Sequence, residues 1–205
     1  MQIKTCFLLF LAALFYTCQQ KTTNDSNQTR LKSVYIGGVR PTSGYIESLI
    51  IIGMDMPNLA GIDELKHLKK VIIDASRIAD YSDLKKVPHI ELLALRRIST
   101  VKDISFLAYF TNLHSLKIND TKVESIDSLS GLVQLKTLDI SNTLVHDISP
   151  LSHTKIEWLK MLKIDPGDGS NLPATLKHLI ISKKYQYRMP ALKSKLPDCT
   201  IVLSN

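Results

Sequence analysis

The chain carries one apolar pattern, L-x-x-L-x-L, that returns every 20 to 23 residues. The pattern is most regular in LKTLDI (135–140), and Leu113, Leu116 and Ile118 hold the same places one copy earlier. Its eight copies begin at Ile46, Leu68, Ile90, Leu113, Leu135, Ile156, Leu176 and Leu196. A unit repeated at a short fixed period buries its apolar face only against its neighbours, so the chain is predicted to form a solenoid.

Each copy also predicts a short β-strand. The last two apolar residues of the pattern flank a single residue, and this period of two places them on one face of a strand. Strands that recur in one direction pair in parallel, and the chain returns along the opposite side between them. Ordering each residue costs roughly 1–2 kcal/mol, which one repeat cannot recover by burial alone, so the array should fold as one unit.

These repeats resemble the leucine-rich repeat family in the short 22-residue form of bacterial internalin-type proteins, L-x-x-L-x-L-x-x-N-x-I-x-D-I-x-x-L-x-x-L. The resemblance implies an α/β solenoid, a horseshoe with a parallel concave sheet and short helical or 3-10 turns on the convex side. The column that the family usually fills with Asn departs from the pattern and reads Met54, Ser76, Ile98, Thr121 and Thr143. Ser and Thr can still bond the turn backbone, whereas Met54 and Ile98 cannot, so we expect interruptions of this ladder there.

A second column of polar residues bears on catalysis. His146 and Asp147 have the residue types of a general base and its orienter. The Asp147 column, however, recurs as Asn58, Asp80, Asp103, Ser125 and Asp147, with Asn171 as a looser sixth member. These residue types cap helix N-termini, and a catalytic carboxylate would occur once rather than in every repeat. The pattern therefore predicts that Asp147 is a cap.

Other motifs of enzymes are missing from the sequence. It contains no G-x-S-x-G, no H-E-x-x-H, no P-loop and no G-x-G-x-x-G. The three cysteines, Cys6, Cys18 and Cys199, form neither a CxxC motif nor a Cys/His cluster. We therefore expect no enzyme activity, no metal site and no cofactor.

The N-terminal residues predict export. The apolar run from Cys6 to Tyr16 is shorter than the roughly 20 residues that span a bilayer, and it fits a signal peptide over residues 1–17. Residues 15–18, Phe-Tyr-Thr-Cys, resemble a bacterial lipobox, although Phe15 and Thr17 stand where that pattern prefers Leu and a small residue. The resemblance implies a lipid anchor at Cys18 in the bacterial envelope, at the outer membrane or surface. Ordinary secretion and an uncleaved anchor are the alternatives.

The rest of the chain divides by composition. Residues 18–30 read as a polar tether, and residues 31–45 as an N-terminal cap whose strand is LKSVYI (31–36). Residues 46–205 form the repeat domain, with a C-terminal cap made of a short helix over 191–196 and a last strand in which Cys199 points inward. From Leu176 onward the chain has six basic residues and one acidic residue, Asp198. This excess of positive charge indicates either a solvated face or a contact with anionic lipid or polysaccharide.

The outward strand residues are the candidates for binding, because the family usually binds macromolecules on its concave sheet. The predicted contact residues are Ile50, Ile72, Leu92, Arg96, Lys117, Asp139, Trp158 and Lys160. Two apolar zones stand out, one around Ile50, Ile72 and Leu92 and the other around Trp158 with Leu162. In the alternative interpretation caps cover both zones, and the loop over 165–172 folds across Trp158.

The sequence thus favours an exported binding module with a protein or glycan partner outside the cytoplasm, reached through the concave face. We expect contact with the membrane only through the anchor at Cys18, and no nucleic-acid partner. Two other functions remain open: a structural component of the envelope without a soluble ligand, and an envelope hydrolase that uses Asp and His side chains of the concave face.

Overall fold

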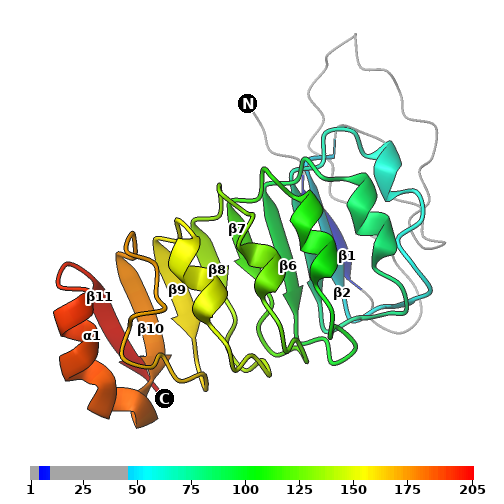
Figure 1. Cartoon of the computed structure of the whole chain (residues 1–205). Coiled ribbons are helices and arrows are strands. Elements are labelled where there is room, and N and C mark those ends of the chain that lie inside the picture. The colour runs from blue at the N-terminus through cyan, green and yellow to red at the C-terminus, as the bar shows by residue number, and fades with distance from the viewer. Residues whose placement is uncertain (1–4, 10–45) are drawn as a thin grey trace.

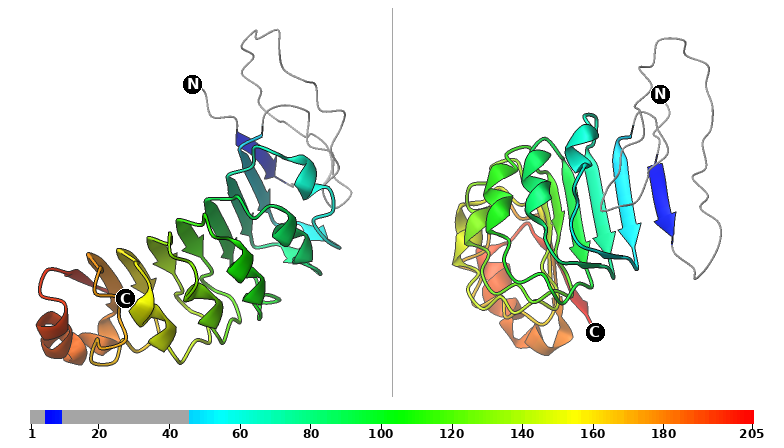
Figure 2. Two further views of the ribbon diagram at one scale, coloured as in Figure 1. Left: turned by 45° about the horizontal axis from the view of Figure 1, so that its top comes forward. Right: turned by 90° about the vertical axis from the view of Figure 1, so that its right-hand side faces the viewer.

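The eight predicted strands form one parallel sheet in a computed structural model that describes residues 5–9 and 46–205. The strands are β2 (Ser48–Ile52), β4 (Lys70–Asp74), β6 (Leu92–Arg96), β7 (Ser115–Lys117), β8 (Thr137–Asp139), β9 (Trp158–Met161), β10 (His178–Ser182) and β11 (Thr200–Ser204), in that order. The sheet lines one side of a curved solenoid, and short helices line the other (Figures 1 and 2). The predicted horseshoe is confirmed.

A ninth strand, β1 (Thr5–Leu9), pairs in parallel with the outer edge of β2. This is the place that the sequence assigned to residues 31–36. That predicted strand lies outside the described residues, as do the predicted tether and most of the predicted signal peptide. Within the part of the chain that the structure describes, no helix has both the length and the apolar character needed to cross a membrane.

The core is one continuous cluster that runs through every repeat. Register places the inward residues of neighbouring strands opposite one another, as in Leu93, Leu116 and Leu138, which are fully buried. Each such side chain contributes about 1.5–3 kcal/mol when it leaves water. Because these side chains contact the repeats on both sides, no repeat owns a separate core.

The convex side consists of short 3-10 helices, as the family resemblance implied. They are η1 (Ile62–Glu64), η2 (Ser82–Lys86), η3 (Ser105–Tyr109), η4 (Asp127–Leu129) and η5 (Ser149–His153). A small parallel sheet of β3 (Asp55–Met56) and β5 (Arg77–Ile78) precedes η1 and η2.

The polar column of Asp147 bonds the turns that lead into these helices. It does not occupy the N-cap position that the sequence predicted, because that position in η5 belongs to Ile148, which makes no side-chain cap bond. The Asp147 carboxylate accepts the Ser149 backbone N–H at 2.8 Å and the Ser149 hydroxyl at 2.9 Å. Asp80, Asp103, Ser125 and Asn58 accept the N–H two residues later in the same way. Asn171 was wrongly assigned, because the turn bonds of that irregular repeat come from Asp165 and Asp168, which accept the N–H groups of Gly167 and Ser170.

The ladder column behaves as predicted. Thr121 and Thr143 donate their hydroxyls to the carbonyls of Ile118 and Ile140, and Ser76 donates to Asp74 and accepts the Met54 N–H. Met54 and Ile98 are buried apolar side chains and interrupt the ladder. The residue before this column has a positive φ in each of these repeats, from 48° to 66°, at Gly53, Ala75, Arg97, Asp120 and Asn142.

The end of the chain differs from its predicted alignment. Leu179 pairs with Ile201 rather than with Cys199, and Ile181 pairs with Leu203, so the last strand starts two residues later than expected. The reason is a turn at Pro197 and Asp198, closed by a bond from the Cys199 N–H to the Leu196 carbonyl at 3.1 Å. Cys199 therefore precedes β11 and is partly buried, and this burial raises the pKa of its thiol.

Two helical segments, η6 (Lys183–Arg188) and α1 (Met189–Lys195), connect β10 to β11. The predicted helix over 191–196 is thus observed two residues earlier at its start. Pro190 lies in its first turn, where the missing N–H leaves no helical bond unmade.

Candidate functional site

The outward side chains of the sheet fall into rows, because the strands pair in register. Strand pairing places Ile50, Ile72, Ala94, Lys117, Asp139, Lys160 and Ile180 in one row. Leu92 and Trp158 lie in the row two residues earlier, and Arg96 lies in the row two residues later. Neighbouring members of a row are about 4.8 Å apart. The structure therefore brings the eight predicted contact residues onto one surface.

The apolar zone at the β2 end offers little free area. Ile50 retains only 9% of its exposure, and Ala94 retains 2%. Ile72 and Leu92 are half-buried. A partner would therefore contact this zone mainly through Ile72 and Leu92.

Charged residues occupy the middle of the same row. Lys117 and Lys160 flank Asp139 on neighbouring strands. The Asp139 carboxylate is buried and accepts the Ser141 backbone N–H at 3.0 Å. Neither lysine forms an ion pair with a residue in the described range, so both ammonium groups are free to meet a partner.

Arg96 is held in place by a buried carboxylate. Its Nη2 atom lies 2.7 Å from the carboxylate of Asp74, a residue that is 3% exposed. Arg97 donates two further hydrogen bonds to the same carboxylate, and this bonding raises the pKa of the Arg97 guanidinium. The Arg96 side chain is therefore presented in one fixed position rather than as a mobile charge.

Trp158 lies between Thr137 and His178 in the sheet and is half-buried, like Ile72 and Leu92. Beside it, Glu157 accepts a hydrogen bond from Lys177 at 2.6 Å and forms an ion pair with Lys136 at 2.9 Å. These two partners lower the pKa of Glu157 to about 2. The stabilisation from the two bridges is therefore present above the ordinary pKa of 4.5 and is lost as the pH falls from there to about 2, because the unfolded chain takes up the proton first.

The irregular loop over 165–172 packs against α1 at Gly169. A Cβ built on Gly169 would lie 3.2 Å from the Leu192 Cδ2 atom and 3.4 Å from the Lys195 Cβ atom, so this part of the loop lies against α1. Gly169 has a φ of 89°, which favours glycine there.

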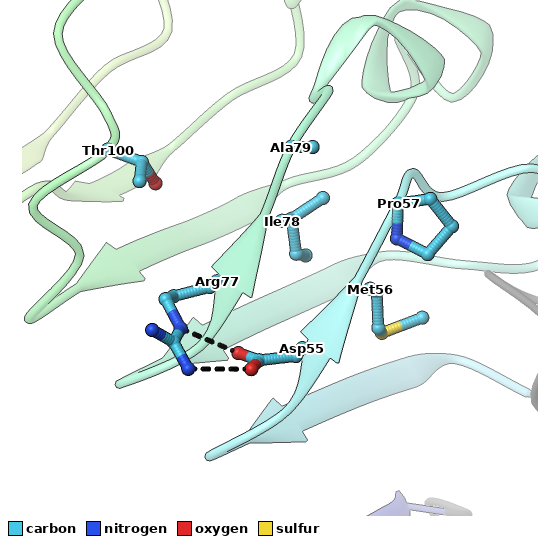
Figure 3. A pocket seen from close by; sticks show the side chains of 7 residues that line it. All are labelled: Asp55, Met56, Pro57, Arg77, Ile78, Ala79 and Thr100. Carbon is cyan, nitrogen blue, oxygen red and sulfur yellow. Dashed lines mark hydrogen bonds and ion pairs between the residues drawn. The ribbon is translucent and has the colours of Figure 1, made fainter.

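A shallow hollow of about 440 Å³ lies beside β3 and β5 (Figure 3). Its lining residues are Asp55, Met56, Pro57, Arg77, Ile78, Ala79 and Thr100. Arg77 donates two hydrogen bonds to Asp55, at 2.8 and 2.7 Å, and these bonds lower the pKa of Asp55. The two charges at the hollow thus neutralise each other, and its lining holds no nucleophile with an adjacent base.

Sequence reasoning missed this hollow, although one signal pointed to it. The third repeat has 23 residues, from Ile90 to Asn112, where the repeats before it have 22. The extra residue is accommodated in a turn at Ser99 and Thr100. Backbone hydrogen bonds join β3 to β5, and the next such bond between repeats comes only where the Lys122 N–H donates to the Val101 carbonyl. The hollow is the gap that this turn leaves.

No described group supports a catalytic site. His146 is exposed, and the Asp147 carboxylate is committed to Ser149, whose bonds lower its pKa. Within residues 5–9 and 46–205 no three His, Cys, Asp or Glu side chains are placed to hold a metal ion.

Comparison with known proteins supports the fold. The family described as "Leucine Rich repeats (2 copies)" matches residues 111–153. A comparison with curated proteins found no match. Among solved structures, internalin C2 of Listeria monocytogenes is 21% identical with a TM-score of 0.62, covering 78% of this chain and 74% of its own.

Two further solved structures share the fold. An internalin (inlF) of the same organism is 21% identical with a TM-score of 0.63, and the match covers 78% of this chain but only 54% of the internalin chain. A Leptospira interrogans leucine-rich repeat protein is 15% identical with a TM-score of 0.52, over 76% of this chain and 48% of its own. By fold the chain is therefore a leucine-rich repeat solenoid similar to internalins, with the family's repeat matched over residues 111–153.

Proposed function

We propose that this chain is an exported binding module that holds a protein or glycan partner on its concave sheet. One observation carries the proposal: Trp158, the only tryptophan, lies on the outward face of that sheet and is only partly buried, beside a row that includes Lys117, Asp139 and Lys160. Tryptophan is enriched among the residues that dominate the binding energy of protein interfaces. A hydrolase would need polar groups that converge on one point, and the described part of the sheet instead spreads its charges along a row.

The proposal includes export and a lipid anchor at Cys18. It rests on the apolar run that precedes Cys18 and on the polar segment that follows it. Cleavage before Cys18 would remove β1 and leave the edge of β2 without that neighbour. Residues 31–36, with the same L-x-x-V-x-I pattern as the repeats, would then be available to pair there.

Replacing Trp158 by Ala should weaken partner binding by about 2 kcal/mol or more, because the substitution removes a large, partly exposed ring from the outward face of the sheet. Photo-crosslinking residues placed at Lys117 and Lys160 in the full chain would first identify the partner in envelope extracts. The dissociation constant of the purified partner is then measured for the parent chain and for the Trp158→Ala variant.

Tyr109→Ala is the matched control, because Tyr109 is also an exposed ring, 59% accessible, on the convex helix η3. This variant should bind as the parent does. An equal loss of affinity in both variants, or a Trp158→Ala chain that loses thermal stability along with affinity, would contradict a contact role.

The anchor has its own test. Metabolic labelling with a palmitate analogue should mark the full chain expressed in a bacterium, and Cys18→Ala should abolish the label. Cys199→Ala is the control and should keep it, because Cys199 lies against the core at the other end of the chain. Label that persists in Cys18→Ala would rule out the anchor while leaving the concave-face proposal intact.

A further inference from the structure

The segment that follows β10 has a charge unlike the rest of the described chain. Residues 46–175 contain 15 Lys and Arg against 17 Asp and Glu, a net charge of −2. Residues 176–205 contain six Lys and Arg against one Asp, a net charge of +5. Positive charges concentrated in this way repel one another, and this repulsion is relieved either by ion pairs within the fold or by an anionic partner.

Pairing within the fold accounts for only two of the six cations. Lys177 bonds Glu157 at 2.6 Å, and Arg188 bonds Asp165 at 2.9 Å. Four cations remain, all of them exposed and none in an ion pair with a described residue: Lys183, Lys184, Lys193 and Lys195. They all belong to η6 and α1, which we call the η6–α1 unit (residues 183–195; orange-red in Figure 1).

The unit is attached firmly to the solenoid. The Tyr185 hydroxyl donates to the Lys163 carbonyl at 3.0 Å, and Leu192 is fully buried in the common core. Gly169 of the preceding loop lies against Leu192 and Lys195. The four lysines therefore project from a fixed backbone, and a ligand need not order that backbone when it binds.

An exposed aromatic ring accompanies the lysines. Tyr187 is 62% exposed, and the Arg188 guanidinium carbon lies 5.0 Å from its ring centroid. Because Asp165 holds Arg188, that contact in turn holds the Tyr187 ring in the middle of the KKYQYR segment. The unit thus combines several exposed ammonium groups outside ion pairs with one flat, accessible ring that carries a hydroxyl.

We propose that the η6–α1 unit binds an anionic polysaccharide, with the four lysines on its acidic groups and Tyr187 against a sugar ring. Short segments rich in Lys and Arg commonly bind heparin-like polymers. A bilayer fits less well, because helices that lie on membranes expose large apolar side chains, whereas Leu192 of α1 is buried. Single-stranded nucleic acid would need successive stacking rings, and the Tyr185 ring is tied to Lys163 and faces the Lys184 ammonium group, 4.6 Å from its centroid.

The lysines are tested by neutralising all four in the full chain, as K183Q/K184Q/K193Q/K195Q. Affinity for heparin, a sulfated polymer, and for polygalacturonate, a carboxylated one, is measured by titration at low and moderate salt. We expect the variant to lose at least about tenfold in affinity for the preferred polymer and to show a weaker salt dependence. The two polymers tell which acidic group is bound.

The matched control changes the same charge elsewhere. K66Q/K102Q/K122Q/K155Q removes four exposed lysines that form no ion pair within the described residues. It should change affinity by less than about twofold, since the unit itself is intact. Tyr187→Ala should also weaken binding, while Tyr109→Ala should not, although Lys85 lies 5.5 Å from the Tyr109 ring in the same manner.

Four results would overturn the proposal. They are no binding of the parent chain to either polymer at low salt, equal losses in the two lysine variants, and a loss of affinity for phosphatidylglycerol vesicles or for an oligonucleotide that equals the loss for the polymers. An unchanged affinity in Tyr187→Ala would be the fourth, because charge alone would then explain the binding. None of these results bears on the concave face, which the Trp158 experiment tests separately.

Discussion

Replacing Phe110 by Ala should lower the free energy of unfolding by about 3–5 kcal/mol. Phe110 is fully buried, and its ring packs edge-on against Phe106 with the centroids 6.2 Å apart. The substitution would leave a cavity between the helix side and the sheet in the middle of the array. Because the repeats share one core, we expect the whole solenoid to lose stability in a single transition, measured by urea unfolding followed by circular dichroism.

Tyr109→Ala serves as the comparison, since it removes the neighbouring ring, at the last residue of η3, without opening a cavity. Its side chain is exposed, so the change in free energy should stay within about 0.5–1 kcal/mol. Similar losses in the two variants, or two separate unfolding transitions in Phe110→Ala, would mean that the core is not continuous through the third repeat.

The second large effect is expected at Gly169. Its φ of 89° is unfavourable for any side chain, and a Cβ there would press on Leu192 and Lys195 of α1. Gly169→Val should therefore cost about 2–4 kcal/mol, from backbone strain together with overpacking. Thermal unfolding of the purified full chain measures the loss.

Gly167→Val separates the two causes. Gly167 also has a positive φ, 63°, but a Cβ added there would meet no atom within 4 Å. That variant should carry only the backbone strain, about 1–2 kcal/mol. If Gly169→Val is no worse than Gly167→Val, α1 does not rest on this loop.

The sequence predicted the sheet because its signal is geometric. Alternation within each L-x-L and a near-constant spacing between copies are sufficient to set strand, direction and stacking, as the register of Leu93, Leu116 and Leu138 shows. The structural role of the polar column was predictable for a similar reason, since a residue that recurs at the same place must serve each repeat in the same way. The sequence placed this column at the N-cap, whereas its side chains bond the turn just before each helix, and Ile148 holds the N-cap position of η5.

Features that depend on one repeat were not predictable in this way. The two-residue shift of β11 arises from the turn at Pro197 and Asp198, which uses chain that the pattern had counted as strand. The sequence could place Ile50 on the concave face but could not say that its neighbours leave it only 9% exposed. The ion pairs of Asp74 with Arg96 and Arg97 could not be predicted either, because the carboxylate and the two guanidinium groups lie in different repeats.

The extra residue of the third repeat has a practical consequence. The turn at Ser99 and Thr100 absorbs it completely, and Leu93 still pairs with Leu116 in register across the break. A change of chain length at this turn therefore leaves the pairing of the concave sheet unchanged. Both residues of the turn are exposed. A fluorophore or an epitope tag inserted between Ser99 and Thr100 would report on the protein while leaving the rows of the sheet undisturbed.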